Sequence, residues 1–228
     1  MPIIRKIKLG IDYNSILRRQ GVSKHSTITP KVAEQSQELL KEISKLSLLE
    51  PLLAYETYSV VELEHDRLYL GDNLALHGSL LQSTMGGAKR IAAAVCTIGP
   101  KLEKKSKSYI TGGKVLRGLL LDGIGSTALD FLRQEACRII ALDASSDGYQ
   151  SGSPISPGIP RFPLSEQPQV LKLAHAERIG ISLTSSGVMQ PIKSCSMVIG
   201  LGQKMKMWSA AQTCAHCPIH RTCRYRVS

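Results

Sequence analysis

The segment over residues 114–142 constrains the fold most, because it is long, largely apolar and punctuated by Gly118, Gly123 and Gly125. One interpretation is a single long helix whose glycines let another backbone or a ligand approach closely. The other divides the segment into a strand, a turn and a helix. A long helix would pack on other elements of a mixed domain, whereas the divided segment would begin a doubly wound sheet.

The divided interpretation rests on Gly123-Ile-Gly125-Ser-Thr-Ala128, which matches the dinucleotide-binding pattern G-x-G-x-x-A. Residues 139–143 then resemble a second strand that ends in an acid at about the expected distance. The first strand of such a unit would, however, contain Arg117 and Gly118, and Asp122 directly precedes the glycines. A nicotinamide-dependent enzyme built on Gly123–Ala128 is therefore the less favoured alternative.

The rest of the chain predicts helices mixed with hairpins. Pro30 is placed to begin a helix that ends before Pro51. Alternating apolar residues predict a hairpin over residues 58–70, and residues 90–98 form a buried-strand pattern. Further expected elements are helices over residues 11–20, 101–109 and from Ser165 or Glu166 to Arg178, strands over 181–183 and 196–200, and a strand or helix over 205–211. Because strands and helices do not alternate regularly, we expect an α+β fold.

Composition narrows the class of protein. The chain has 228 residues, 43% apolar and 21% charged, which is ordinary for a folded protein. Its net charge of +11 is concentrated in residues 101–107 and 221–226. Aromatic residues make up only 4%, which argues against a nucleic-acid module built on stacking platforms. A metal-stabilised nucleic-acid binder remains an alternative, and only the positive charge of the chain favours it.

The sequence also indicates the cellular compartment to expect for the protein. No apolar run approaches the roughly 18 to 20 residues that a membrane span needs. Residues 1–8 lack the long apolar core and the cleavage site of a signal peptide. We therefore expect a cytoplasmic protein that meets no membrane, in a compartment where disulfides are rare.

Cysteines are crowded near the C-terminus, where Cys214, Cys217 and Cys223 lie within ten residues. A Cys-x-x-Cys turn brings two thiolates onto one face of a tight loop, as zinc or an iron–sulfur cluster requires. His216, His220 or a distant cysteine such as Cys195 would supply the fourth ligand. The alternative is a set of reactive thiols, or a redox pair, without metal. The isolated cysteines are expected to be small core side chains: Cys96, Cys137 and Cys195.

A series of motifs in a fixed order carries the most specific signal. It consists of Ala94–Pro100, Leu121–Ser126, Ser156-Pro157-Gly158, Gln167, Ile179–Thr184 and Met189-Gln-Pro191-Ile-Lys193-Ser194. Together these motifs resemble the activation (reactivation) domain of cobalamin-dependent methionine synthase, and most of all its stand-alone relatives. The resemblance covers about residues 55–212. An N-terminal helical extension over residues 1–54 and a cysteine-rich tail over residues 213–228 lie outside it.

The resemblance implies a single domain with a curved antiparallel sheet and surrounding helices. It implies docking on a corrinoid-binding methyltransferase, or on a methionine synthase that lacks its own activation domain. There, an electron and the methyl group of S-adenosylmethionine restore methylcobalamin from cob(II)alamin. The chain would be an activation component rather than a complete enzyme. The alternative is a docking or electron-delivery module that does not bind S-adenosylmethionine.

Site residues follow from the resemblance position by position. S-adenosylmethionine contacts fall on the turn Ser156, Pro157, Gly158 and Ile159, and on Ser126. The family has an arginine and a tyrosine around that turn, where this chain has Pro154 and Ile159. The family's second helix acid, which faces the amine of the methyl donor, falls on Ser126.

Contacts to the corrinoid domain are implied for a second set of residues. The first helix acid of the family falls on Asp122, which is kept. Lys193 and Ser194 belong to the Met-x-Pro-x-Lys-Ser turn, where either a functional or a turn-stabilising role is open. A cluster held by Cys214, Cys217 and Cys223 would deliver the electron if it contains iron and sulfur, whereas zinc would be structural.

Overall fold

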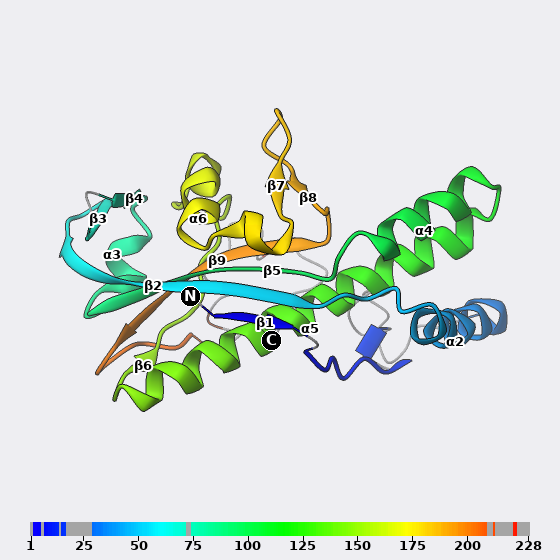
Figure 1. The fold of residues 1–228 in the computed structure, drawn as a ribbon, viewed down its shortest axis with the longest axis horizontal. Coiled ribbons are helices and arrows are strands. Elements are labelled where there is room, and N and C mark those ends of the chain that lie inside the picture. Colours follow the sequence, from blue (N-terminus) through cyan, green and yellow to red (C-terminus); the bar gives the residue numbers. More distant parts are fainter. Residues whose placement is uncertain are drawn as a thin grey trace.

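The structure is a computed structural model that describes residues 2–5, 7–13, 15–16, 29–71, 74–208, 212 and 221–222. Its centre is a curved antiparallel sheet with a long helix, α5 (Val115–Ser146), along one face (Figure 1). Helix α6 (Gln167–Leu173) lies on the other face. The fold is therefore the expected α+β class, with helices on both sides of one sheet.

The main sheet has the strand order β4-β3-β2-β5-β9-β6, and β1 pairs with β2 beside this path. Each of these pairings is antiparallel. A separate two-stranded sheet is formed by β7 and β8. The strands are β1 (Ile3–Arg5), β2 (Leu52–Leu63), β3 (Arg67–Leu70), β4 (Leu74–His77), β5 (Arg90–Thr97), β6 (Gln150–Ser151), β7 (Ser182–Leu183), β8 (Met189–Gln190) and β9 (Ser194–Gly202).

Strand β5 lies at the middle of the sheet because its sequence is almost continuously apolar. A strand with hydrogen-bonded neighbours and covered faces can bury every side chain, so strict alternation is not needed. Residues Ile91 to Cys96 have no exposed surface. Alternate side chains of β5 belong to two different cores. The core under α5 contains Ala92, Ala94 and Cys96. The core under α6 contains Ile91, Ala93 and Val95.

The segment that begins at Lys114 forms one helix, and the divided interpretation is wrong. Gly123–Ala128 lies inside α5, and the element before α5 is another helix, α4 (Lys101–Thr111). Dinucleotide binding at this pattern needs a strand before it and free backbone N–H groups at a helix N-terminus. Inside α5 these groups are used by the helix itself, so no dinucleotide site forms there.

The glycines of α5 permit a close approach of α4. A Cβ atom on Gly118 would lie 2.5 Å from Ile110 Cγ1 and 2.9 Å from the carbonyl oxygen of Ser106. The hydroxyl of Ser106 donates a hydrogen bond of 2.8 Å to the carbonyl oxygen of Gly118. On Gly125, a Cβ atom would lie 2.5 Å from Leu102 Cδ2. The glycines thus serve helix packing.

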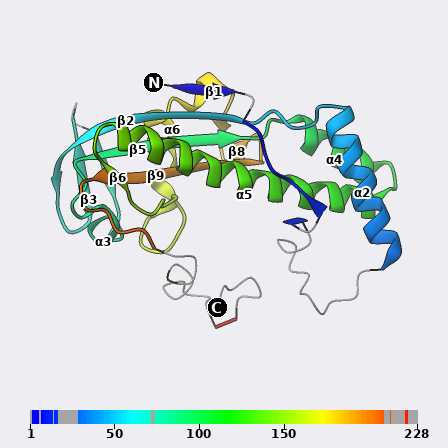
Figure 2. The same ribbon diagram turned by 90° about the horizontal axis from the view of Figure 1, so that it is seen from below.

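The N-terminal residues belong to the same core as α5. Helix α2 (Pro30–Lys45) crosses near the start of α5 and beside α4 (Figure 2). Its Leu39 is fully buried and, with Ile43, joins the cluster under α5. Arg117 on α5 holds α2 through Glu38 at 2.7 Å and Glu42 at 2.8 Å. The division of the chain after residue 54 stays a prediction.

Several sequence-based expectations are confirmed. Helix α2 begins at Pro30, β2 and β3 form the hairpin, and β5 and α4 occupy the expected residues.

The helix expected up to Arg178 is wrong, because α6 ends at Leu173 and His175 has a left-handed backbone at φ 51°. A short 3-10 helix over Ala176–Ile179 follows it. Within residues 205–208 there is neither helix nor strand, and most of residues 11–20 lie outside the described part.

Part of the positive charge on α4 is neutralised within the molecule. Lys101 Nζ lies 2.8 Å from Glu50 Oε1, and Lys105 Nζ lies 3.7 Å from Glu42 Oε1. Lys105 also stands over the ring of Tyr109, 4.8 Å from its centre. The helix is therefore less free to attract an anionic partner than its sequence indicates. Among the described helices, none is both long and apolar enough to cross a membrane.

The close contact at Gly118 predicts that replacing this glycine by alanine destabilises the protein, which is the opposite of the usual effect inside a helix. Glycine to alanine inside a helix normally stabilises by about 1 kcal/mol. Gly118→Ala is expected instead to destabilise by about 1–3 kcal/mol, because the added methyl meets backbone as well as side-chain atoms of α4. Urea denaturation would measure this. Gly71→Ala is the control, since nothing lies within 4 Å of its added Cβ atom. A stabilised Gly118→Ala variant would contradict the packing described.

The contact between α2 and α5 predicts a pH dependence. Burial raises the pKa of Glu42, but hydrogen bonds from Tyr109 and Arg117 outweigh it and hold that pKa below its ordinary value of 4.5. A lowered folded-state pKa gives stability that is present above pH 4.5 and is lost as pH falls through the folded value. We expect Glu42→Gln to be less stable than the parent at neutral pH, with a difference that shrinks towards pH 3.

The measurement is thermal unfolding across that pH range. Glu34→Gln changes an exposed acid of the same helix and serves as the matched control. A difference between the parent protein and Glu42→Gln that stays constant from neutral pH to pH 3 would show that the Glu42 contacts do not titrate as described.

Candidate functional site

Three of the predicted site residues, Asp122, Ser126 and Lys193, meet where α5 passes the start of β9. Lys193, just before β9, reaches α5 and places Nζ 2.9 Å from each carboxylate oxygen of Asp122. The same Nζ lies 2.9 Å from the hydroxyl oxygen of Ser126. Asp122 and Ser126 are four residues apart and so share one helix face. We call Asp122, Ser126 and Lys193 the lysine cluster.

Burial differs across the lysine cluster. The side chain of Lys193 is only 12% exposed, whereas that of Asp122 is 48% exposed. The Lys193 ammonium therefore depends on its partners, because a largely buried charge without them costs free energy. Ser126 also donates a hydrogen bond of 3.3 Å to the carbonyl oxygen of Asp122, so its oxygen can accept from Lys193. The open side of the cluster presents a carboxylate edge.

The backbone around Lys193 is fixed from two directions. Glu103 of α4 accepts hydrogen bonds from the backbone nitrogens of Ile192 at 2.8 Å and Lys193 at 3.4 Å. The carbonyl oxygen of Lys193 accepts from the backbone nitrogen of Ile98 and from the hydroxyl of Thr97, both at 3.2 Å. Glu103 is a site-building residue that the sequence analysis does not single out, because residues 101–107 stand out there only for their positive charge.

Gly125 gives the Lys193 side chain its path along α5. A Cβ atom there would lie 3.5 Å from Lys193 Cε as well as close to Leu102. The Ser194 hydroxyl donates a hydrogen bond of 2.6 Å to the carbonyl oxygen of Pro191 and closes the turn. Ser194 is buried, so the structure supports its turn-stabilising role.

The Ser-Pro-Gly turn lies along the same end of β9. Ile155 and Val198 form a bridge in which each backbone nitrogen donates to the other's carbonyl oxygen, at 3.0 Å and 2.8 Å. Cys96 above all, and to a lesser degree the Ser156 hydroxyl, lower the pKa of the Cys195 thiol. Gly158 has φ 92°, a value that favours glycine, and its nitrogen donates to the carbonyl oxygen of Phe162 at 2.9 Å.

Several predicted residues stand apart from the lysine cluster. Gly158 is exposed and Ile159 is 37% exposed, and Pro157 is buried. Arg161, seven residues after Pro154 in the sequence, donates hydrogen bonds to the hydroxyl and carbonyl oxygens of Ser79. Gln167, part of the motif series, is buried and donates to the Ser196 hydroxyl at 2.8 Å, which is a structural role.

The proposed metal ligands Cys214, Cys217 and Cys223 lie outside the described residues. Within the part of the chain that the structure describes, no three histidine, cysteine or acidic side chains come together as a metal ion would need. Cys195, considered as a fourth ligand from the sequence, lies instead beside Cys96 under α5. The metal site at these cysteines stays a prediction.

Comparisons with known proteins add the fold. No protein-family model matches the chain, and no curated protein matches its sequence. Among solved structures, the MetH reactivation domain bound to AdoHcy is similar, with a TM-score of 0.63 and 14% sequence identity. The similarity covers 88% of this chain and 73% of that one. The chain therefore has the fold of a MetH reactivation domain, as the motif series predicts.

Removing Glu103 tests how the turn before β9 is held. Glu103→Ala leaves the backbone nitrogens of Ile192 and Lys193 without their acceptor, and we expect a loss of about 1 kcal/mol in the free energy of unfolding. Hydrogen exchange at these two amides should accelerate. Lys104→Ala, an exposed neighbour on the same helix, is the control. Unchanged exchange at both amides would remove Glu103 from the site.

Proposed function

We propose that this protein docks on a corrinoid-binding methyltransferase and assists the reductive methylation of cob(II)alamin with S-adenosylmethionine, in support of cobalamin-dependent methionine synthesis. The fold carries this proposal, because it is that of a MetH reactivation domain. The motif residues support it, since Lys193 joins Asp122 of α5 to the start of β9, and Ser156 neighbours Cys195 on the same strand. In this role the chain supplies position and electrostatics to chemistry that belongs to the corrinoid.

The surface around the lysine cluster suits docking. Leu119, one turn before Asp122 on α5, is 59% exposed, and Ile192, next to Lys193, is 63% exposed. Exposed apolar side chains beside a partly exposed charge pair are typical of protein interfaces. Asp122 would contribute a carboxylate edge there that can accept hydrogen bonds from a partner domain.

The fit to S-adenosylmethionine is incomplete. The Ser-Pro-Gly turn is present, so the backbone can approach a ligand at Ser156 and Gly158. At Ser126, where the family has an acid that faces the amine of the donor, this chain holds the Lys193 ammonium instead. A cation at that position repels both the amine and the sulfonium of the donor. Ser126 and Lys193 therefore do not offer the donor the contact that the family's acid makes.

This observation favours a second candidate function. A module that docks on the corrinoid protein, or delivers an electron to it, needs Asp122 and the exposed apolar side chains of Leu119 and Ile192. It does not need a binding site for S-adenosylmethionine. An iron–sulfur cluster at Cys214, Cys217 and Cys223 would supply the electron, while zinc there would be structural. Absorption spectra and metal analysis after anaerobic purification distinguish the two metals.

Co-titration with a cobalamin-loaded methyltransferase fragment tests the proposal. With S-adenosylmethionine and a low-potential reductant present, we expect cob(II)alamin absorption to be replaced by that of methylcobalamin only when this protein is added. Asp122→Asn keeps an acceptor for Lys193 but removes the charge. It should weaken association about tenfold, because a neutral hydrogen bond to the partner contributes about 1 to 1.5 kcal/mol less than a charged one. Glu177→Ala, an acid near α6, is the matched control.

Three outcomes are distinguished by adding calorimetry with S-adenosylmethionine. Remethylation together with donor binding supports the first function. Association with the corrinoid fragment without donor binding supports the second. If this protein neither associates with the corrinoid fragment nor promotes remethylation of its cob(II)alamin, both proposals are wrong.

A further inference from the structure

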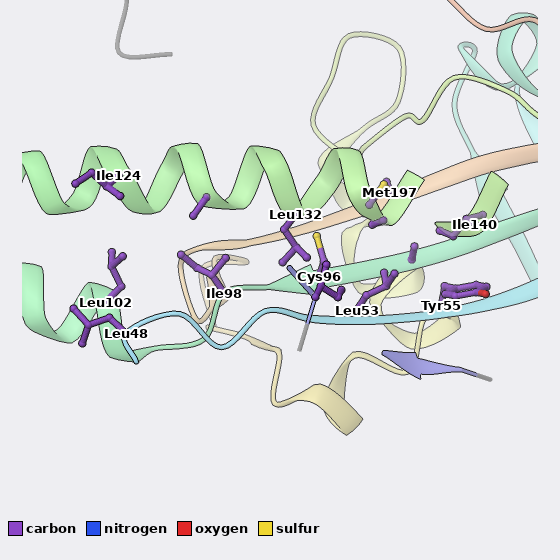
Figure 3. Packing of buried hydrophobic residues seen from close by; sticks show 14 of the residues in the cluster. Leu48, Leu53, Tyr55, Cys96, Ile98, Leu102, Ile124, Leu132, Ile140 and Met197 are labelled. Carbon is purple, nitrogen blue, oxygen red and sulfur yellow. The ribbon is translucent and has the colours of Figure 1, made fainter. Parts of the chain in front are cut away.

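Three cysteines line the core between α5 and the sheet, and the proposed function uses none of them. Cys96 on β5 and Cys195 on β9 are direct partners in the antiparallel register. Cys137 on α5 lies above them, with Sγ 3.7 Å from the Sδ atom of Met197. Figure 3 shows the sulfur of Cys96 pointing from β5 towards α5. The sequence interpretation of all three as small core side chains does not include this proximity.

The register places Cys96 and Cys195 within bonding reach. The backbone nitrogen of Ile98 donates to the carbonyl oxygen of Lys193 two residues further along the same ladder. Hydrogen-bonded pairs alternate along an antiparallel ladder, so Cys96 and Cys195 form such a pair, with Cα atoms about 5.5 Å apart. A disulfide spans Cα separations of about 4.4–6.8 Å. Their side chains share one face, so the strands need not separate for the sulfurs to bond.

The two thiols differ in exposure and acidity. Cys96 is fully buried, whereas Cys195 is half-buried at the end of the sheet that carries the Ser-Pro-Gly turn. A hydrogen bond from the Cys96 thiol lowers the pKa of Cys195, and the same pairing together with burial raises the pKa of Cys96. The charge of Arg133 and the Ser156 hydroxyl also lower the pKa of Cys195. Cys195 is therefore the thiolate that reacts first.

We propose that Cys195 and Cys96 are a reversible redox dithiol that a hydroperoxide closes into a cross-strand disulfide. The Cys195 sulfur attacks the peroxide, an S–O bond forms as the O–O bond breaks, and an alcohol or water leaves with the proton. The Cys96 sulfur then attacks the sulfenic acid of Cys195. The S–S bond forms as the S–O bond breaks, and the Cys96 proton leaves with the hydroxide as water. Two thiols lose two electrons, which the peroxide gains.

The position of the pair gives the oxidation a consequence. Cys195 follows Lys193 by two residues, and its thiol is a partner of Ser156. Closing the disulfide removes the thiol hydrogen bonds at the start of β9, beside the lysine cluster. A small thiol reverses the bond by exchange. The dithiol chemistry stands independently of the proposed function, which would only decide what the oxidation regulates.

Peptide mapping of the intact protein tests the pair directly. Trypsin places Cys96, Cys195 and Cys137 in separate peptides, residues 91–101, 194–204 and 134–138. After treatment with tert-butyl hydroperoxide we expect peptide 91–101 to be linked to peptide 194–204 with the loss of two hydrogen atoms, and dithiothreitol to release it. Before oxidation, iodoacetamide should label Cys195 about tenfold faster than Cys96.

Matched variants separate the pair from the other thiols. Cys137→Ser, and a variant with serine at Cys214, Cys217 and Cys223, should still form the link. Cys96→Ser should leave Cys195 as a sulfenic acid that dimedone traps, and Cys195→Ser should abolish the link while Cys96 stays unreacted. Links from Cys195 only to Cys137 or to the tail, or a Cys195 that resists dimedone in Cys96→Ser, would overturn the proposal. So would equal labelling of Cys96 and Cys195.

Discussion

The close crossing of α4 and α5 is the constraint on which the rest of the structure depends. At Gly118 and Gly125 the two helices approach so closely that a methyl group would collide with α4. Helix α5 has 32 residues and is about 48 Å long. The crossing lets α5 cover the sheet while α4 packs against the N-terminal half of α5. It also brings Glu103 of α4 to the turn before β9. The same packing that builds the core therefore positions Lys193.

Lys193 determines the electrostatics of the candidate site. Its buried stem and its ammonium join α5 to β9, and Asp122 and Ser126 satisfy the charge. The family resemblance implies an acid at the position of Ser126 that faces the amine of the methyl donor. In this protein the Lys193 ammonium lies against Ser126 instead, so any group that approaches Ser126 meets a cation.

Much of the fold followed from local patterns in the chain. The apolar run of β5, the hairpin of β2 and β3 and the start of α2 at Pro30 each have a short-range cause, namely strand burial, alternation and a fixed proline φ. The helix expected beyond Leu173 failed because His175 adopts a left-handed backbone that its residue type does not reveal. Asp122, Ser126 and Lys193 were singled out from motifs, but Glu103 was not, because its role depends on where α4 lies.

The sequence by itself determined the α+β class, the long α5 segment and the motif series, because periodicity and residue order are properties of the chain. It left two interpretations of the α5 glycines, and it treated Cys96 and Cys195 as separate core residues. Only the tertiary structure decided these points. Glycines 118 and 125 face α4, and antiparallel register brings together two cysteines that lie 99 positions apart in the numbering, from 96 to 195. Contacts of that range depend on how elements pack, which no local pattern encodes.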